Sequence, residues 1–332
     1  MTRLALVCPG RGSYTEASLG SLPAEHPLVL TAEKLRGEFG LESLVALDQA
    51  PKFVPAAHLR PANVSALIYV VSMLDVERVQ TTGEAVCVLG NSMGWYTALA
   101  VGGALSFEDG FRLVQHMALL QEKGVSGGQL IYPLVDEDWV LVPEREAAVR
   151  VALEALPGQA FPSIHLAGYT VLAGDEAGLA ALRKALPPVQ QGGVNYPLRL
   201  AQHGPYHTPL AQGVADDAQR HLQGLQFGLP QVPLVDGRGM AWSPWSSDLH
   251  KLRAYTLGAQ VTQPYNLTAS IVTALKEYAP DRLVLLGPGN TLGGICGQVL
   301  IQERWQGIDS RAAFTQRQAG PEPILDSLGR GR

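Results

Sequence analysis

The sequence has 332 residues, of which 46% are hydrophobic and 17% are charged. This length and composition allow a large buried core and exclude a disordered chain. The formal net charge is −5 and there is no long basic run, which argues against nucleic acid as the partner.

The N-terminal part of the chain predicts alternating strands and helices. The run RLALVCPG (3–10) is short, apolar and closed by Pro-Gly, which is typical of a buried strand followed by a loop. Helical apolar spacing follows over 29–47 and 61–79, and EAVCVLG (84–90) predicts a second buried strand. Ser106 is placed to cap a further helix. This alternation predicts an α/β fold with a mainly parallel sheet.

The composition changes after about residue 128, where a smaller unit is predicted. Over 129–200 the patterns read as strand, helix, two strands, helix and strand, which is the ferredoxin-like order. We therefore expect a large α/β subdomain over 1–128 and 201–305, with a ferredoxin-like small subdomain inserted at 129–200. The polar residues 306–332 are expected to form a separate, loosely held C-terminal tail.

Nothing in the sequence predicts a membrane protein, a metal site or a resident cofactor. The apolar start is too short for a signal peptide, and the longest apolar run is shorter than a membrane span. Cys8, Cys87 and Cys296 are odd in number and far apart, which suits a reducing compartment. We therefore expect a soluble, cytoplasmic protein that does not contact the membrane.

The stretch VLGNSMGWYTALA (88–100) fits the Gly-x-Ser-x-Gly pattern with Ser92 at its centre. In this pattern the serine occupies a sharp strand-to-helix turn, and the glycines let neighbouring backbone approach closely. The context of an apolar strand before the motif and a helix after it favours a nucleophile over an ordinary turn serine. A serine nucleophile needs a base, and His203 and His207 stand out because they flank a Gly-Pro turn. The residues alone do not choose between these two histidines.

Four segments together resemble the malonyl-CoA:acyl-carrier-protein transacylase family, which includes the acyltransferase domains of polyketide synthases. CPGRGSY (8–14) is similar to the family's first loop, and the segment that starts at GNSMG is similar to its Gly-His-Ser-Leu-Gly elbow. HGPYHTPL (203–210) resembles the loop of the catalytic histidine, and LVLLGPGNTLGG (283–294) resembles a Gly-Pro-Gly turn near the C-terminus. Their order and spacing agree over roughly residues 3 to 300, and the insertion falls where the family has it.

The resemblance implies a role for several residues. Ser92 would carry the acyl group, and His207 would act as its general base and as the acid for the leaving thiol. The backbone amides of Arg11 and Met93 would form the oxyanion hole. A backbone carbonyl orients the histidine in this family, and the segment QVTQPYN assigns that carbonyl to Gln263. The implied partners are acyl-CoA and an acyl carrier protein, and acyl-CoA is a substrate rather than a cofactor.

Three departures from the family concern substrate binding. Asn91 replaces the histidine before the nucleophile, and Met117 replaces the arginine that pairs with the free carboxylate of a malonyl group. In the other direction, Arg11 and Arg60 stand where the family has glutamines. The carboxylate site is therefore either lost, which means an uncharged acyl group, or relocated to one of these arginines. Of the two alternatives the sequence favours the uncharged acyl group.

Two other functions compete with transfer between acyl-CoA and a carrier protein. An acyl hydrolase on the same scaffold would use water as the second acceptor, and some relatives in polyketide pathways that lack the arginine proofread stalled carrier proteins. The two activities differ in how well water is excluded from the acyl-enzyme, which the sequence does not show. A degenerate scaffold protein is the third alternative, and the presence of both Ser92 and His207 argues against it.

Overall fold

A six-stranded, mainly parallel sheet forms the large subdomain in the computed structural model, which describes residues 1–123 and 126–329. Its strand order is β10-β9-β2-β1-β12-β13, and among the described strand pairs in it only β9–β10 is antiparallel. The strands are β1 (Arg3–Cys8), β2 (Glu84–Gly90), β9 (Leu234–Val235), β10 (Ala241–Trp242), β12 (Arg282–Leu285) and β13 (Leu325–Ser327). The two apolar runs predicted as buried strands are β1 and β2, which pair with each other in the middle of this sheet.

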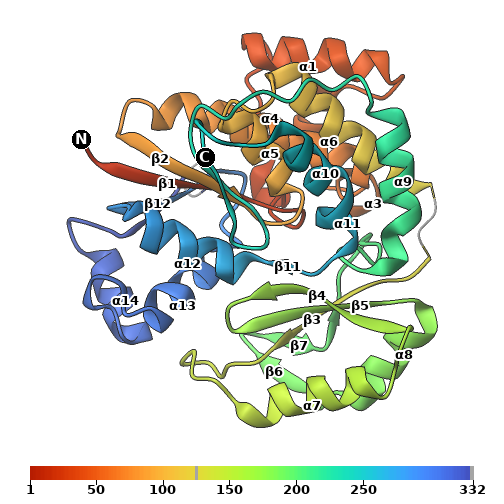
Figure 1. Ribbon diagram of the computed structural model, residues 1–332, viewed down its shortest axis with the longest axis vertical. Coiled ribbons are helices and arrows are strands. Elements are labelled where there is room, and N and C mark those ends of the chain that lie inside the picture. Colours follow the sequence, from red (N-terminus) through yellow and green to blue (C-terminus); the bar gives the residue numbers. More distant parts are fainter. Residues whose placement is uncertain (124–125, 330–332) are drawn as a thin grey trace.

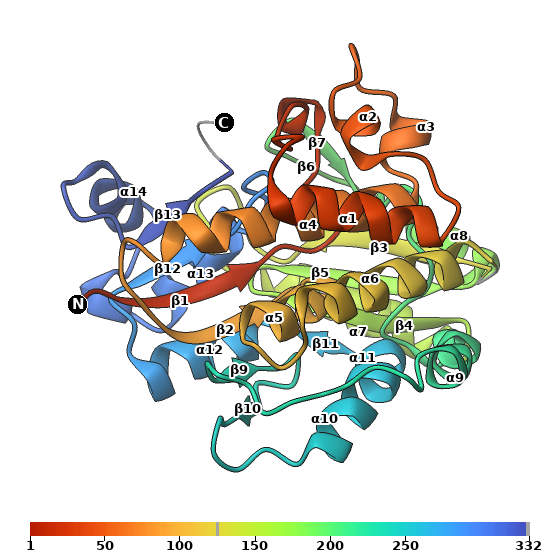
Figure 2. The ribbon, with the colours of Figure 1, turned by 90° about the horizontal axis from the view of Figure 1, so that it is seen from above.

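Helices surround this sheet (Figure 1), and α1, α4 and α6 pack against one another (Figure 2). The α-helices outside the small subdomain are α1 (Pro27–Glu38), α2 (Leu44–Asp48), α3 (Pro55–His58), α4 (Pro61–Val79), α5 (Gly94–Val101), α6 (Phe107–Glu122), α9 (Gln212–His221), α10 (Leu249–Ala254), α11 (Gln260–Thr262), α12 (Leu267–Tyr278), α13 (Gly293–Gln302) and α14 (Arg311–Ala319). None of the helices in the described part of the chain is long and apolar enough to cross a membrane.

Local sequence signals explain where the early helices begin and end. The Ser106 side chain accepts a hydrogen bond from the Asp109 amide at 3.1 Å and so caps α6, as predicted. The helical pattern predicted over 29–47 forms two helices, because Ser43 accepts a hydrogen bond from the Ala46 amide and starts a new helix there.

The small subdomain has the predicted ferredoxin-like order, and it lies below the large sheet in Figure 1. Its sheet order is β11-β4-β5-β3-β8, in which β11 (Tyr265–Asn266) comes from the later part of the chain. Its other elements are β3 (Gly128–Pro133), α7 (Pro143–Glu154), β4 (Ala160–Leu166), β5 (Tyr169–Gly174), α8 (Glu176–Ala185), β6 (Val189–Gln191), β7 (Val194–Tyr196) and β8 (Leu198–Arg199). The fold class predicted from the sequence is confirmed.

The C-terminal segment differs from the prediction of a separate tail over 306–332. Strand β13 pairs in parallel with β12, so this segment completes one edge of the large sheet. On the adjoining helix α14, the half-buried face carries Phe314, which packs against the ring of Trp139 with ring centroids 5.7 Å apart. The sequence pattern did not predict strand β13, because this strand has only three residues and its partner lies about forty residues earlier in the sequence.

Candidate active site

Ser92 occupies the sharp turn between the end of β2 and the start of α5. Its φ of +55° lies in the left-handed region, which non-glycine residues adopt at a cost and which is concentrated at functional sites. The flanking glycines are required by close backbone contacts. A Cβ on Gly90 would lie 2.2 Å from the carbonyl carbon of Gly94, and one on Gly94 would lie 2.3 Å from the Cys8 carbonyl oxygen. The turn therefore holds the serine rigidly at the carboxyl end of a central strand.

The loop after β1 lies against this turn and contributes to the same cavity. The Asn91 amide donates to the Cys8 carbonyl at 3.0 Å, which joins the two segments. Arg11 and Met93, whose amides were predicted to form the oxyanion hole, both line the cavity around Ser92. Neither amide donates a hydrogen bond to another residue in the described part of the chain, so both N–H groups are available to a ligand. Their role stays a prediction.

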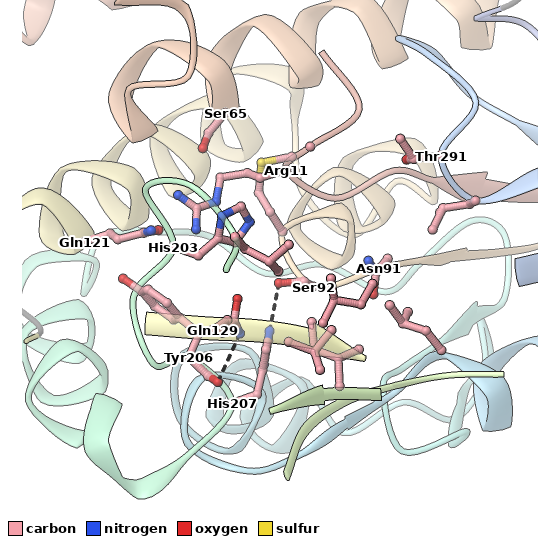
Figure 3. A pocket seen from close by; sticks show the side chains of 18 of the residues that line it. Arg11, Ser65, Asn91, Ser92, Gln121, Gln129, His203, Tyr206, His207 and Thr291 are labelled. Atoms are coloured by element: carbon pink, nitrogen blue, oxygen red, sulfur yellow. Dashed lines mark hydrogen bonds between the residues drawn. The ribbon is translucent and has the colours of Figure 1, made fainter. Parts of the chain in front are cut away.

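A hydrogen bond joins Ser92 to His207, residues that are 115 positions apart in the sequence. The distance from Ser92 Oγ to His207 Nε2 is 2.8 Å, and the dashed line in Figure 3 marks it. His207 also has a positive φ, of +60°. On the other side of its ring, Nδ1 lies 2.6 Å from the Gln260 carbonyl oxygen. A carbonyl only accepts, so Nδ1 carries the hydrogen and Nε2 keeps a lone pair that accepts from the serine hydroxyl.

The carbonyl that orients His207 therefore belongs to Gln260, and the assignment to Gln263 was wrong. A π-helical stretch η3 (Tyr255–Ala259) runs directly into the short helix α11, so the chain turns differently from a regular helix. Gln260 is the first residue of α11 and lies in the last turn of the helical stretch that η3 and α11 form together, where carbonyl groups have no partner within the helix. Gln263 is the residue after this helix and is already extended, with φ −122° and ψ 153°.

Burial keeps the His207 imidazole neutral at physiological pH. Desolvation lowers the pKa of His207 to about 4, with a smaller lowering effect from the Arg11 charge, while the bond to Gln260 acts in the opposite direction. A neutral imidazole is the form that accepts a proton from serine. The loop of this histidine is also fixed by the small subdomain, since Ser163 Oγ donates to the Tyr206 carbonyl at 2.9 Å.

A cavity of about 300 Å³ opens beside Ser92, between the two subdomains. Asn91 and Met117, two of the three departures noted from the sequence, both line it. A large aliphatic part of the wall comes from α6, the small sheet and the start of α13. These aliphatic residues are Val114, Met117, Ala118, Ile131, Ile164, Leu166, Val171, Leu200, Leu292 and Ile295.

Arg60, predicted to bind substrate, is absent from the wall of this cavity. Its guanidinium instead forms a bidentate ion pair with Glu122, in which Nε lies 3.1 Å and Nη2 2.9 Å from the carboxylate oxygens. Glu122 also accepts from the Ala62 amide at 2.8 Å, so the pair fixes the start of α4 against the end of α6. The proposed relocation of the carboxylate site to Arg60 is therefore wrong, because a paired guanidinium is not free for a substrate.

The side chain of Gln260 is a functional feature that sequence reasoning missed. It accepts from the Tyr96 hydroxyl at 2.7 Å and donates to the Ser92 carbonyl at 3.0 Å. One residue thus holds the nucleophile's backbone with its side chain and the base with its carbonyl. The sequence gives no signal for this, because 168 positions separate the two bonded groups.

We expect Gln260→Ala to lower both stability and the rate of Ser92 acylation. One buried and one partly buried hydrogen bond are lost, which corresponds to about 1–3 kcal/mol in the free energy of unfolding. Loosening of the turn at Ser92 should slow acylation about tenfold. Urea unfolding and quenched-flow acylation measure the two effects. The matched control is Gln298→Ala, which removes a buried bond to the Gly168 amide and should affect stability alone. An unchanged acylation rate in Gln260→Ala would contradict the positioning role.

The fold and the site define a class: an α/β protein with a serine–histidine pair at the carboxyl end of a parallel strand, the arrangement of acyl-transferring enzymes. The relatives are of the same kind. The malonyl CoA-acyl carrier protein transacylase of Haemophilus influenzae is 24% identical over 323 residues, which cover 95% of this chain and 97% of that protein. The polyketide biosynthesis protein ThaF of Burkholderia thailandensis is 26% identical over 304 residues, which cover 90% of this chain but 24% of that protein.

A solved structure of a type II polyketide synthase acyl-carrier protein in complex with its malonyl-transacylase matches with a TM-score of 0.74 and 21% identity, over 98% of this chain and 95% of that one. No protein-family model matches the chain. The predicted resemblance to the malonyl-CoA:acyl-carrier-protein transacylases, and with it the prediction of an acyltransferase, is confirmed.

Proposed function

We propose that this protein transfers an acyl group from coenzyme A to the thiol of an acyl carrier protein, through an ester on Ser92. The observation that carries this proposal is the 2.8 Å contact between Ser92 Oγ and His207 Nε2, with both residues in the left-handed backbone region. The resemblance to named transacylases supports the acceptor.

The first half-reaction forms the ester. Ser92 Oγ attacks the thioester carbonyl while its proton passes to His207 Nε2, and the carbonyl oxygen becomes an oxyanion. The amides of Arg11 and Met93 donate to that oxyanion. When the tetrahedral intermediate collapses, the carbon–sulfur bond breaks and the imidazolium returns its proton to the leaving thiolate. The products are acyl-Ser92 and free coenzyme A.

The second half-reaction is the reverse with a different thiol. His207, neutral again, removes the proton of the carrier protein's phosphopantetheine thiol, whose sulfur then attacks the ester. Collapse of the intermediate releases Ser92, which regains its proton from the imidazolium. The proposed chemistry uses acyl-CoA as a substrate and needs no resident cofactor.

A panel of acyl-CoA donors with and without a holo acyl carrier protein tests this function. We expect intact-protein mass spectrometry to show an acyl adduct on Ser92 and, after addition of carrier protein, its loss with a matching gain on the carrier. Free acid without an acceptor would instead mark the hydrolase, the alternative that the relatives do not support. If no donor gave an adduct, the proposal would be overturned, and a scaffold protein would be the remaining alternative.

A further inference from the structure

Several polar side chains of the cavity lie together at one end of it. Figure 3 shows Arg11, Gln121 and His203 on one side of Ser92, and Asn91 on the other. A thioester bound at Ser92 has two arms, the acyl group and the pantetheine chain. The side chains at the polar end therefore determine which chemical group can be carried by the arm that reaches them.

Arg11 is a partly buried cation without an anion. Its Nη1 donates to the Gln202 carbonyl at 3.2 Å, and no salt bridge to it occurs among the described residues. Burial lowers the pKa of Arg11 to about 10, so it keeps its charge at neutral pH. Glu122 is near enough to influence this pKa, but its oxygens already bind Arg60 and the Ala62 amide.

The Tyr206 hydroxyl is a second, independent sign of a ligand. Its oxygen is buried and has no hydrogen-bond partner among the residues that the structure describes, although an unpaired buried hydroxyl is costly. The ring extends to the same end of the cavity as Gln121 (Figure 3), and the Arg11 charge acts on it. Burial raises the pKa of Tyr206, so the hydroxyl stays protonated and can donate.

His203 does not add a second positive charge. Burial lowers its pKa to about 3, and its Nδ1 donates to the Ala201 carbonyl at 2.8 Å. The remaining nitrogen of a neutral ring then only accepts. The Arg11 guanidinium and the Tyr206 hydroxyl, which has no partner among the described residues, can both donate, and together they match an anion with two acceptor oxygens.

We propose that Arg11 and Tyr206 form a relocated carboxylate-binding subsite, which makes Arg11 the residue that selects an acyl group ending in a carboxylate. This inference rests on the proposed function and reverses the preference for an uncharged acyl group that Met117 suggested. A phosphate of coenzyme A offers the same chemistry. It lies at the far end of the pantetheine chain, however, whereas Arg11 lines the cavity that holds Ser92.

The test compares Ser92 acylation by malonyl-CoA and by butyryl-CoA, which differ in the terminal carboxylate. We expect the wild type to prefer malonyl-CoA. Arg11→Gln should lower the malonyl-to-butyryl rate ratio about 100-fold, because a charge-assisted pair is lost, and Tyr206→Phe about tenfold. The matched control is Arg60→Gln, which removes a guanidinium already paired with Glu122 and should leave the ratio within about threefold. Because each variant is scored as a ratio, partial unfolding does not imitate the result.

A phosphate-free donor separates the two anions. With malonyl-N-acetylcysteamine, the loss in Arg11→Gln should persist if the side chain binds the acyl carboxylate. Three results would overturn the inference and leave the proposed function intact. In the first, Arg11→Gln is acylated by this donor as fast as the wild type is. In the others, Arg11→Gln loses rate equally with both coenzyme A esters, or butyryl-CoA acylates the wild type faster than malonyl-CoA does. If none of the donors labelled Ser92, both the inference and the proposed function would be refuted.

Discussion

Ser92→Ala should abolish the acyl-enzyme, with the rate of transfer from acyl-CoA to carrier protein falling on the order of 10⁵-fold. The reason is that alanine removes the only atom that bonds to the acyl group, while the amides of the first loop and the base remain. The measurement is the intact mass after incubation with acyl-CoA, together with the rate of carrier-protein loading. Alanine keeps the same backbone constraint at the turn, so the fold should persist.

A second buried serine provides the control for this variant. Ser270 donates to the Asp236 carbonyl at 2.7 Å and is absent from the cavity wall. Ser270→Ala should lower the free energy of unfolding by about 1 kcal/mol and keep the acyl label. Labelling of the Ser92→Ala protein at full stoichiometry would show that another residue is the nucleophile.

The elbow was predictable because local sequence determines it, whereas the choice of His207 over His203 came from the resemblance to the transacylase family. Glycine is required at 90 and 94 because a Cβ there would lie 2.2 and 2.3 Å from neighbouring backbone atoms, so the spacing of the motif reports the geometry directly. The same holds for the apolar runs of β1 and β2, whose burial on both faces requires continuous hydrophobic residues.

The errors arose where long-range pairing or irregular backbone decides the structure. Arg60 is paired with Glu122, which is 62 positions away, and no local pattern records such a pair. Gln260 rather than Gln263 faces the histidine, and matching QVTQPYN to the family motif did not record that the helical stretch ends between these two residues.

Asn91 shows a limit of the sequence argument about substrate. Asn91 and Met117 were both predicted to be departures at the substrate-binding site, and both residues do line the cavity. The Asn91 side chain, however, lies on the side of Ser92 away from Arg11 (Figure 3), and its Oδ1 is buried with no hydrogen-bond partner in the described ranges 1–123 and 126–329. The sequence identified the changed positions, but only the structure separates the two ends of the cavity.

His207→Ala should slow acylation about 10³-fold at neutral pH, the size of effect that general-base catalysis supplies. The pH profile gives a sharper test than the loss itself. Because the neutral imidazole is the active form, the wild-type rate constant should be nearly flat from pH 8 to about pH 5.5 and should fall at lower pH, with a midpoint near the His207 pKa of about 4. In His207→Ala this acidic limb should disappear. Circular dichroism at each pH establishes that the protein remains folded.

Variants of two neighbouring residues test whether the acidic limb of the pH profile reports the titration of His207. His203 has a pKa of about 3 and also lines the cavity, yet His203→Asn should leave the midpoint close to 4 because this ring takes no proton from the serine. Arg11→Gln should move the midpoint upward, since removing a nearby positive charge makes protonation of His207 easier. A midpoint near 6.5 in the wild type would mean that the imidazole is solvated in solution, and the tight serine–histidine contact would then not describe the active enzyme.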